Sequence, residues 1–178
     1  MINDTQKYWN QYHDIIDIPE TWQDDRTRTC NICCIAMITG KNPNDILREM
    51  LDKYGINDQF QWEENLIGYL ESSGYECFPI TELAYPKPRY ITIADFDKMC
   101  AIIDSGQIIL YHKYGHYQLF IGYEDNEFSR CYIFNDPAGD RTLPLAMRTK
   151  NSGHCVRYSE TFVLEEKIFG RCWVVKID

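Results

Sequence analysis

The order of hydrophobic patterns along this chain is the feature that most limits its fold. Four segments with apolar residues at helical spacing come first, each closed by a glycine: "TCNICCIAMITG", "KNPNDILREMLDKYG", "QWEENLIGYLESSG" and "TIADFDKMCAIIDSG". Short runs rich in β-branched and aromatic residues follow: "QIILYHKY", "HYQLFIGY", "SRCYIFND", "CVRYS" and "RCWVVKI". Helices followed by a mostly antiparallel sheet predict an α+β fold of two packed layers.

Local signals predict where several of these elements begin and end. Asn42 is a candidate N-cap with Pro43 in the first helical turn, and Thr92 with Asp95 resembles a capping box. "YECFPI" is expected to be a strand, whereas the prolines of "AYPKPRY" predict a loop. A short helix is expected in "ETFVLEEKIFG", and the mixed first twenty residues are expected to lie over the surface.

The length and composition indicate one globular domain over residues 1–178, because neither an internal repeat nor a low-complexity linker divides the 178 residues. No run of about eighteen apolar residues exists, so no stable membrane insertion is expected. The chain begins without the basic and then apolar order of a secretory signal. This predicts synthesis in the cytosol, with release to a cell wall, if it occurs, by another agent.

Charge and cysteine content exclude two further classes. The net charge is −9, and the 18 basic residues are scattered, which argues against a nucleic-acid groove. Eight cysteines are many for this length. Because no secretory signal is seen and the chain is long enough for its own core, we expect most of them to be small buried hydrophobes rather than a disulfide framework.

Three of the cysteines lie at the front of the first apolar helix, where thiol chemistry is favoured. The unpaired amides and the dipole of a helix N-terminus stabilise a thiolate. Cys30 lies at that start and is therefore the candidate nucleophile. Cys33 and Cys34 lie about one turn further along and are expected to pack in the core. The spacing Cys30-x-x-Cys33 also matches a redox pair, but no thioredoxin-like strand clearly precedes it.

A thiolate nucleophile needs a base held by a rigid element. His116 follows Gly115 at the beginning of a predicted strand and is the favoured base. His112, near the end of the preceding strand, is its competitor and is interpreted as a structural residue. His13 and His154 occur in less ordered contexts. Together with the isolated cysteines, these histidines give only a weak zinc signal, and no metal is expected.

The base in turn needs a group that orients its ring, and hairpin geometry supplies a candidate. If the loop over residues 125–127 has an odd number of residues, His116 lies directly opposite Asp136. A two-residue loop would oppose Asn135 instead. Asp136 is favoured because Pro137 then ends the strand behind it. The oxyanion donors would be the backbone amide of Cys30 and the side chain of Gln23, seven residues upstream.

These residues resemble the papain-like cysteine peptidases of family thirty-nine over roughly residues 22–177. The resemblance is carried by Gln23, Cys30, Gly115-His116-Tyr117 and Asn135-Asp136-Pro137. Where the family usually has Cys-Gly-Pro-Thr-Cys, this chain has Cys30-Asn31-Ile32-Cys33-Cys34, and its gap from glutamine to cysteine is about one residue longer. The resemblance implies a papain-like fold, a Cys30–His116–Asp136 triad with Gln23 at the oxyanion, and no cofactor.

The expected function is cleavage of a peptide or isopeptide bond. The segments "GHCVRYSETF" and "GRCWVV" are similar to the tail of phage and prophage members. This likeness implies a peptidoglycan endopeptidase of the endolysin type, with a peptide or peptidoglycan substrate. Alternatives are a leader-peptide or protein-processing peptidase inside the cell, a transglutaminase-like acyltransferase, and a non-catalytic binding protein on the same fold. The oligomeric state cannot be read from the sequence.

Overall fold

The computed structural model describes residues 7–22, 29–55, 63–80, 85–127, 129–170 and 172–176, with the backbone alone at residues 21, 85–88 and 168–170. Its helices are η1 (Glu20–Trp22), α1 (Cys30–Thr39), α2 (Pro43–Tyr54), α3 (Glu63–Ser72), α4 (Ile93–Asp104), η5 (Leu145–Met147) and α5 (Glu160–Leu164). Its strands are β1 (Cys77–Pro79), β2 (Tyr85–Tyr90), β3 (Ile108–Lys113), β4 (His116–Asp125), β5 (Arg130–Asn135), β6 (Val156–Ser159), β7 (Lys167–Gly170) and β8 (Trp173–Val175).

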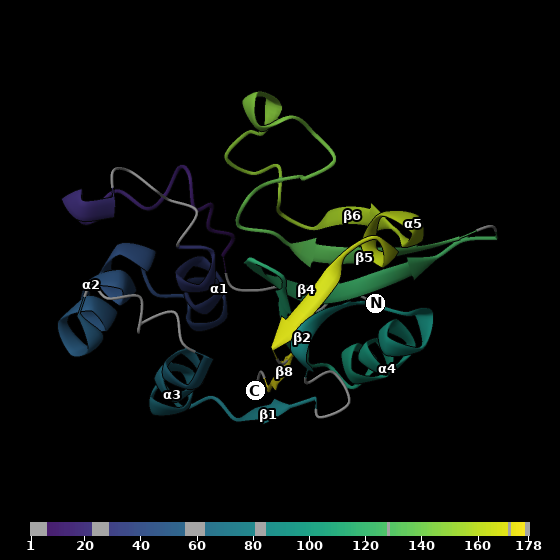
Figure 1. Cartoon of the computed structure of the whole chain (residues 1–178), viewed down its shortest axis with the longest axis horizontal. Coiled ribbons are helices and arrows are strands. Elements are labelled where there is room, and N and C mark those ends of the chain that lie inside the picture. Colours follow the sequence, from purple (N-terminus) through teal and green to yellow (C-terminus); the bar gives the residue numbers. More distant parts are fainter. Residues whose placement is uncertain are drawn as a thin grey trace.

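The strands form one antiparallel sheet in the order β1-β8-β3-β4-β5-β6, and β7 pairs with β3 and carries β2 beyond it. The helices α1, α2 and α3 lie together on one side of this sheet, while α4 and α5 lie on the other (Figure 1). The fold is therefore α+β, as the sequence predicts. No helix among the described residues is long and apolar enough to cross a membrane.

Alternation along the central strands explains why both faces of the sheet are covered. Ile108 and Leu110 of β3 pack with α1, whereas their neighbours Ile109 and Tyr111 pack with α4 on the opposite face. Successive side chains of a strand point to opposite faces, and here both sets are apolar. The prediction of two layers was wrong for this reason, since helices cover two faces rather than one.

The helix ends follow the local signals in the sequence. Gly40 ends α1 in the left-handed conformation at φ 72°. The Asn42 side chain caps α2 by accepting a hydrogen bond from the Asn44 amide at 2.9 Å. Thr92 and Asp95 form the reciprocal capping box at the start of α4. Residues two or three positions apart in the sequence form these caps, so the helix boundaries can be predicted without knowledge of the fold.

Two segments differ from what the sequence predicts. The proline-containing segment "AYPKPRY" is not a loop, because residues 85–90 form β2, which pairs with β7 across an irregularity in register. A strand at this outer position needs few donors, so it tolerates proline. The N-terminal segment does not simply lie over the surface either: Tyr8 and Ile15 are buried in the cluster that includes α1.

Candidate active site

The first residue of α1 is Cys30, and the whole helix from residue 30 to residue 38 is buried against the sheet. Apolar residues around all sides of a helix produce such burial. Cys33 and Cys34 are fully buried, and burial raises the pKa of each thiol well above its ordinary value. They are therefore inert packing residues, in agreement with the sequence interpretation. All eight cysteines are free thiols.

Cys30 has a different environment from its two neighbours, although only 6% of it is exposed. Burial raises the pKa of its thiol, but the charge and hydrogen bond of His116 and the backbone amides of Tyr117 and Asn31 outweigh this effect, so the pKa is lowered. The Tyr117 amide lies 3.4 Å from Sγ. Donors that converge on a sulfur at a helix start stabilise the thiolate.

His116 is the first residue of β4, directly after a tight turn in which Gly115 has φ 77°. Its Nε2 lies 2.7 Å from Oδ1 of Asp136. The hydrogen bond with Cys30 therefore falls to the other ring nitrogen, Nδ1. Burial lowers the pKa of His116, but the charges of Asp136 and Cys30 raise it to about 9. His116 therefore lies between the Cys30 thiol and the Asp136 carboxylate, and both neighbours favour the charged form of its ring.

His112, the competing base, does not take part. Its ring stacks on Tyr117 at 4.0 Å, and burial and the charge of His116 lower its pKa to about 4. His13 lies in the N-terminal segment, and the ring of His154 lies 5.7 Å from that of Tyr8. Among the four histidines, His116 is the one that bridges a thiol and a carboxylate.

Asp136 meets His116 by a register other than the predicted one. The hairpin loop spans residues 126–129, with Asp125 paired to Arg130, and the register shifts between Phe120 and Gly122. As a result Leu119, rather than residue 117, lies opposite Asn135. The prediction that His116 and Asp136 are directly opposed was wrong. Asp136 lies just beyond β5 and reaches His116 diagonally, which the shift in register makes possible.

The side chain of Asn135, the alternative orienting residue, is used elsewhere. Its Oδ1 accepts a hydrogen bond from the backbone amide of Cys155 at 2.9 Å. The carboxylate of Asp136 is fully buried and accepts four hydrogen bonds. Oδ1 accepts from His116 and from the Ala138 amide at 2.9 Å, and Oδ2 accepts from Arg141 Nε at 2.5 Å and Tyr158 at 3.0 Å.

Arg141 is the member of this site that sequence reasoning missed. Its guanidinium contacts Asp136, Glu166 and the Gln118 side chain, and Glu166 also accepts a hydrogen bond from Lys113. Burial raises the pKa of Asp136, but the charges of His116 and Arg141 outweigh it and hold that pKa well below its ordinary value. The charges alternate in sign along the chain of groups, so each buried charge has an opposite neighbour.

The turn that carries Asp136 is fixed by close backbone contacts. The backbone amide of Asp136 donates to the Gly153 carbonyl at 2.9 Å, and the backbone carbonyl of Asp136 accepts from the Tyr8 hydroxyl at 2.6 Å. A Cβ at Gly153 would lie 2.0 Å from that carbonyl oxygen. Only glycine fits at this position, which gives a structural reason for the "GHC" segment that the sequence alone does not supply.

The expected oxyanion donors are only partly described. Gln23 lies outside the described residues. The backbone amide of Cys30 is the first of α1, a position with no partner within the helix. Beside it, Asn31 is 2% exposed, and its side-chain Nδ2 has no hydrogen-bond partner among the described residues.

Comparisons with known proteins add no assignment to this geometry. No protein-family model matches the sequence, and no curated protein is significantly similar to it. Functional inference therefore rests on the arrangement of Cys30, His116 and Asp136.

Proposed function

We propose that this protein is a cysteine peptidase with a papain-like fold, in which Cys30 is the nucleophile, His116 the base and then the acid, and Asp136 the orienting carboxylate. The observation that carries the proposal is the continuous hydrogen-bonded series from Cys30 through His116 to Asp136. The three residues come from a helix start, a strand start and a strand end, and an imidazolium between a thiolate and a buried carboxylate is suited to nucleophilic catalysis.

The proposed reaction proceeds in two steps, acylation of Cys30 and hydrolysis of the thioester. The Cys30 thiolate attacks the carbonyl carbon of the scissile bond, and the carbonyl oxygen becomes an oxyanion that the Cys30 amide and Gln23 would stabilise. His116 donates its Nδ1 proton to the leaving amine as the carbon–nitrogen bond breaks and a thioester forms. His116, now neutral, takes a proton from water, whose oxygen attacks the thioester carbonyl. The carbon–sulfur bond then breaks, the carboxylic acid leaves, and the Cys30 thiolate is restored beside the imidazolium.

Asp136 and Arg141 support these steps without contacting substrate. Asp136 accepts from Nε2 of His116, so that Nδ1 is directed toward the sulfur. Arg141 holds the second carboxylate oxygen and balances its charge while the ring passes between its charged and neutral forms. Arg141 is therefore a positioning residue, because it acts through Asp136 rather than on the reacting atoms.

We propose peptidoglycan as the substrate, through its stem peptides or cross-bridges. The support for this part is the resemblance to phage-type lysins in the segments that follow the triad, and it is independent of the thiol geometry. A zymogram with purified cell wall tests it: wild type is expected to clear the wall, and Cys30→Ala is not. Clearing by Cys30→Ala would refute the nucleophile.

Thiol labelling tests the activity class without a known substrate. At neutral pH, iodoacetamide is expected to alkylate Cys30 before the other seven cysteines, and peptide mass analysis locates the modified residue. The reason is that the pKa of the Cys30 thiol is lowered, whereas burial raises the pKa of Cys33, Cys34, Cys77, Cys100 and Cys172. Cys131→Ala, which removes a partly exposed thiol, is the matched control and should leave that rate unchanged. A Cys30 that reacts no faster than the other cysteines would favour a non-catalytic binding protein on this fold.

A further inference from the structure

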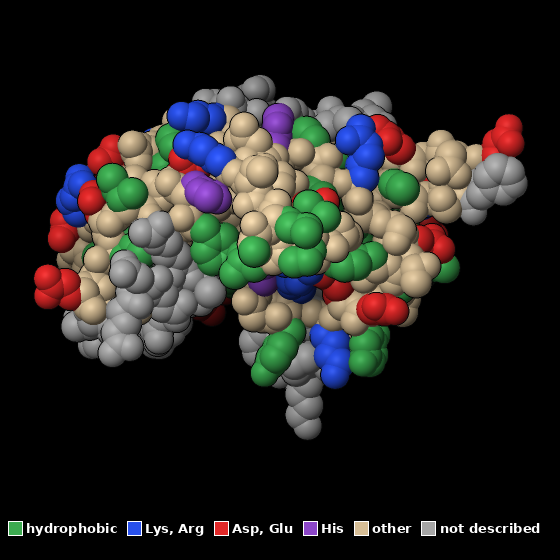
Figure 2. Space-filling view, turned by 90° about the horizontal axis from the view of Figure 1, so that it is seen from above, with side chains coloured by type: hydrophobic (Ala, Val, Ile, Leu, Met, Phe, Trp, Pro, Cys, Tyr) green, Lys and Arg blue, Asp and Glu red, His purple; other side chains and the backbone are tan. Residues whose placement is uncertain are grey.

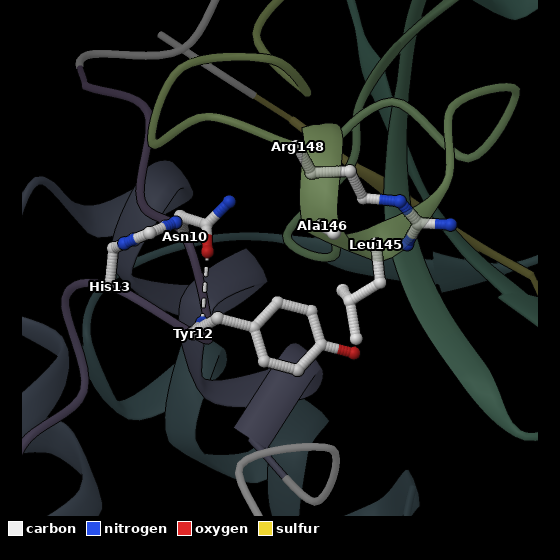
Figure 3. A pocket seen from close by; sticks show the side chains of 6 residues that line it. All are labelled: Asn10, Tyr12, His13, Leu145, Ala146 and Arg148. Atoms are coloured by element: carbon white, nitrogen blue, oxygen red, sulfur yellow. Dashed lines mark hydrogen bonds between the residues drawn. The ribbon is translucent and has the colours of Figure 1, made fainter.

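A pocket of about 340 Å³ opens between the N-terminal segment and the loop around η5. It is lined by Asn10, Tyr12, His13, Leu145, Ala146 and Arg148. Figure 3 shows the Tyr12 ring directed across the pocket toward Leu145, with Arg148 on the same side as Leu145. Its size is at the lower end of small-molecule sites, enough for one or two peptide side chains.

Both walls of this pocket are tied to the turn that carries Asp136. On one side, the Gln11 amide donates to the Pro137 carbonyl at 3.0 Å, next to Tyr12. On the other, Nη1 of Arg148 donates to the Ala138 carbonyl at 3.1 Å. Burial raises the pKa of Tyr12, the charge of Arg148 lowers it, and the charges of Cys30 and Asp136 raise it. The pocket is therefore joined through two hydrogen bonds to the turn that follows Asp136.

The lining combines an apolar wall with a cation. Leu145 is 58% exposed, and Leu143 and Met147 of the same loop are also exposed. This loop stands above the sheet in Figure 1, and in the view from above hydrophobic side chains gather near the centre of the face (Figure 2). Exposed apolar side chains grouped beside a polar rim are typical of a binding surface.

The charge of the pocket is opposite to that of the whole chain. The protein carries a net charge of −9, yet the described residues that line the pocket include Arg148 and no carboxylate. The nearby Asp14 is paired with Lys150 at 2.5 Å and with the Asn10 amide at 2.9 Å. The Arg148 guanidinium donates to two backbone carbonyls, from Nε to Leu143 at 3.0 Å and from Nη1 to Ala138, which leave its charge without an acidic partner in the lining. Such a cation favours a carboxylate on the ligand.

We propose that this pocket is a substrate subsite, which binds an aliphatic peptide residue bearing a carboxylate beside the scissile bond. Leu145 contacts the aliphatic part, and Arg148 with the Tyr12 hydroxyl holds the carboxylate. The proposal rests on the proposed function, since it takes Cys30 as the nucleophile and assigns substrate binding to a pocket joined to the turn that follows Asp136. The carboxylate belongs to either an acidic side chain or a free C-terminus, and both present the same chemistry to Arg148.

Affinity labels distinguish these sources. We would use N-bromoacetyl-leucine with a terminal carboxylate, its neutral amide, and N-bromoacetyl-glutamic acid α-amide with a side-chain carboxylate. In each reaction the Cys30 sulfur attacks the CH2 carbon, the carbon–bromine bond breaks and bromide leaves. Each rate is divided by that of the same reagent with free mercaptoethanol, which removes intrinsic differences in reactivity.

In the wild type, at least one carboxylate reagent is expected to alkylate Cys30 on the order of tenfold faster than the neutral amide, after this correction. Arg148→Gln is expected to remove that preference, and Arg148→Lys to retain part of it. Arg157→Gln, which removes an exposed cation paired with Glu124, is the matched control and should retain it in full. The reagent that shows the preference identifies the source of the carboxylate.

A second variant, Leu145→Ser, is needed because Arg148 also donates to backbone carbonyls of Leu143 and Ala138, so its replacement can disturb the loop itself. Leu145 is exposed, so its replacement should not unfold the protein, yet it should slow the leucine reagents several-fold and leave iodoacetamide unaffected. Equal preferences in wild type and Arg148→Gln, or an unchanged rate in Leu145→Ser, would overturn the subsite. Failure of Cys30 to react faster than the other cysteines with iodoacetamide would instead count against the proposed function.

Discussion

Replacement of Asp136 by asparagine tests how the buried carboxylate supports the thiol. In the wild type, both carboxylate oxygens accept two hydrogen bonds, from His116 and Ala138 on one side and from Arg141 and Tyr158 on the other. An asparagine side chain keeps one acceptor oxygen and adds an amino group that only donates. The amino group of asparagine then faces either His116 and the Ala138 amide or Arg141 and Tyr158, all of which are donors. Arg141 also loses one of its two carboxylate partners, and Glu166 remains as the other.

The expected magnitude can be worked from His116. Burial lowers its pKa, yet the charge of Asp136, ahead of that of Cys30, raises it from 6.5 to about 9. One pKa unit corresponds to about 1.4 kcal/mol, so the charged ring is favoured by about 3 kcal/mol relative to water. Removal of one partner of a buried ion pair costs about 3–5 kcal/mol. We therefore expect Asp136→Asn to lower the free energy of unfolding by about 3 kcal/mol or more and to lower the pKa of His116.

The assay is the second-order rate constant for alkylation of Cys30 by iodoacetamide, measured from about pH 4 to about pH 10. In the wild type, the thiolate is expected to react below the pH at which an ordinary thiol ionises. In Asp136→Asn, the pKa of His116 falls, so the sulfur loses the imidazolium beside it and the pKa of Cys30 rises. The rise in alkylation rate therefore moves to higher pH. Glu124→Gln, which breaks an exposed ion pair with Arg157, should change neither profile nor stability. An Asp136→Asn variant with wild-type stability and an unchanged profile would refute the reasoning.

Three further predictions follow from the same contacts. Arg141→Gln leaves Asp136 and Glu166 without their shared guanidinium and should cost about 3 kcal/mol or more in urea unfolding, with only partial recovery in Arg141→Lys; a Gln variant as stable as wild type contradicts this. Gly153→Ala forces a Cβ against the Asp136 carbonyl and should cost about 1–3 kcal/mol and slow alkylation of Cys30. The control Gly68→Ala, in α3 with open space around it, should be neutral or stabilising, and equal behaviour of the two variants would disprove the close contact. Finally, the lowered pKa of Asp136 stabilises the folded state at pH values above 3.8, the ordinary pKa of the group, and this stabilisation is lost as the pH falls through the folded-state pKa. The difference in stability between wild type and Asp136→Asn should therefore narrow in acid. A difference that stays constant with pH would mean that the carboxylate charge is not responsible.

The parts of the fold that the sequence predicts depend on short-range chemistry. The cap at Asn42 and the capping box at Thr92 involve residues two or three positions apart, so their spacing in the chain is also their spacing in space. The three main helices that precede β1 are predicted for the same reason. The strand β2 was missed because proline excludes a central strand locally, whereas the outer position of β2 is known only from the sheet.

The candidate site divides in the same way. The positions of Cys30 at a helix start and His116 at a strand start can be read from the sequence, and the structure brings their side chains together. The register that links His116 to Asp136 could not be read, because a bulge within β4 and a four-residue loop both change the pairing. Neither leaves a signal in the sequence strong enough to fix the alignment of the two strands.

By itself the sequence determined which residues have the chemistry for thiol catalysis and on which kinds of element they lie, because helix starts, strand starts and caps are decided by neighbours along the chain. Only the tertiary structure decided that Arg141, Glu166 and Lys113 share one buried network behind Asp136, and that Tyr12 and Arg148 face one pocket. Lys113 and Glu166 lie 53 residues apart in the chain, and Tyr12 and Arg148 lie 136 residues apart. Burial of opposite charges together is favourable only once the sheet has closed around them.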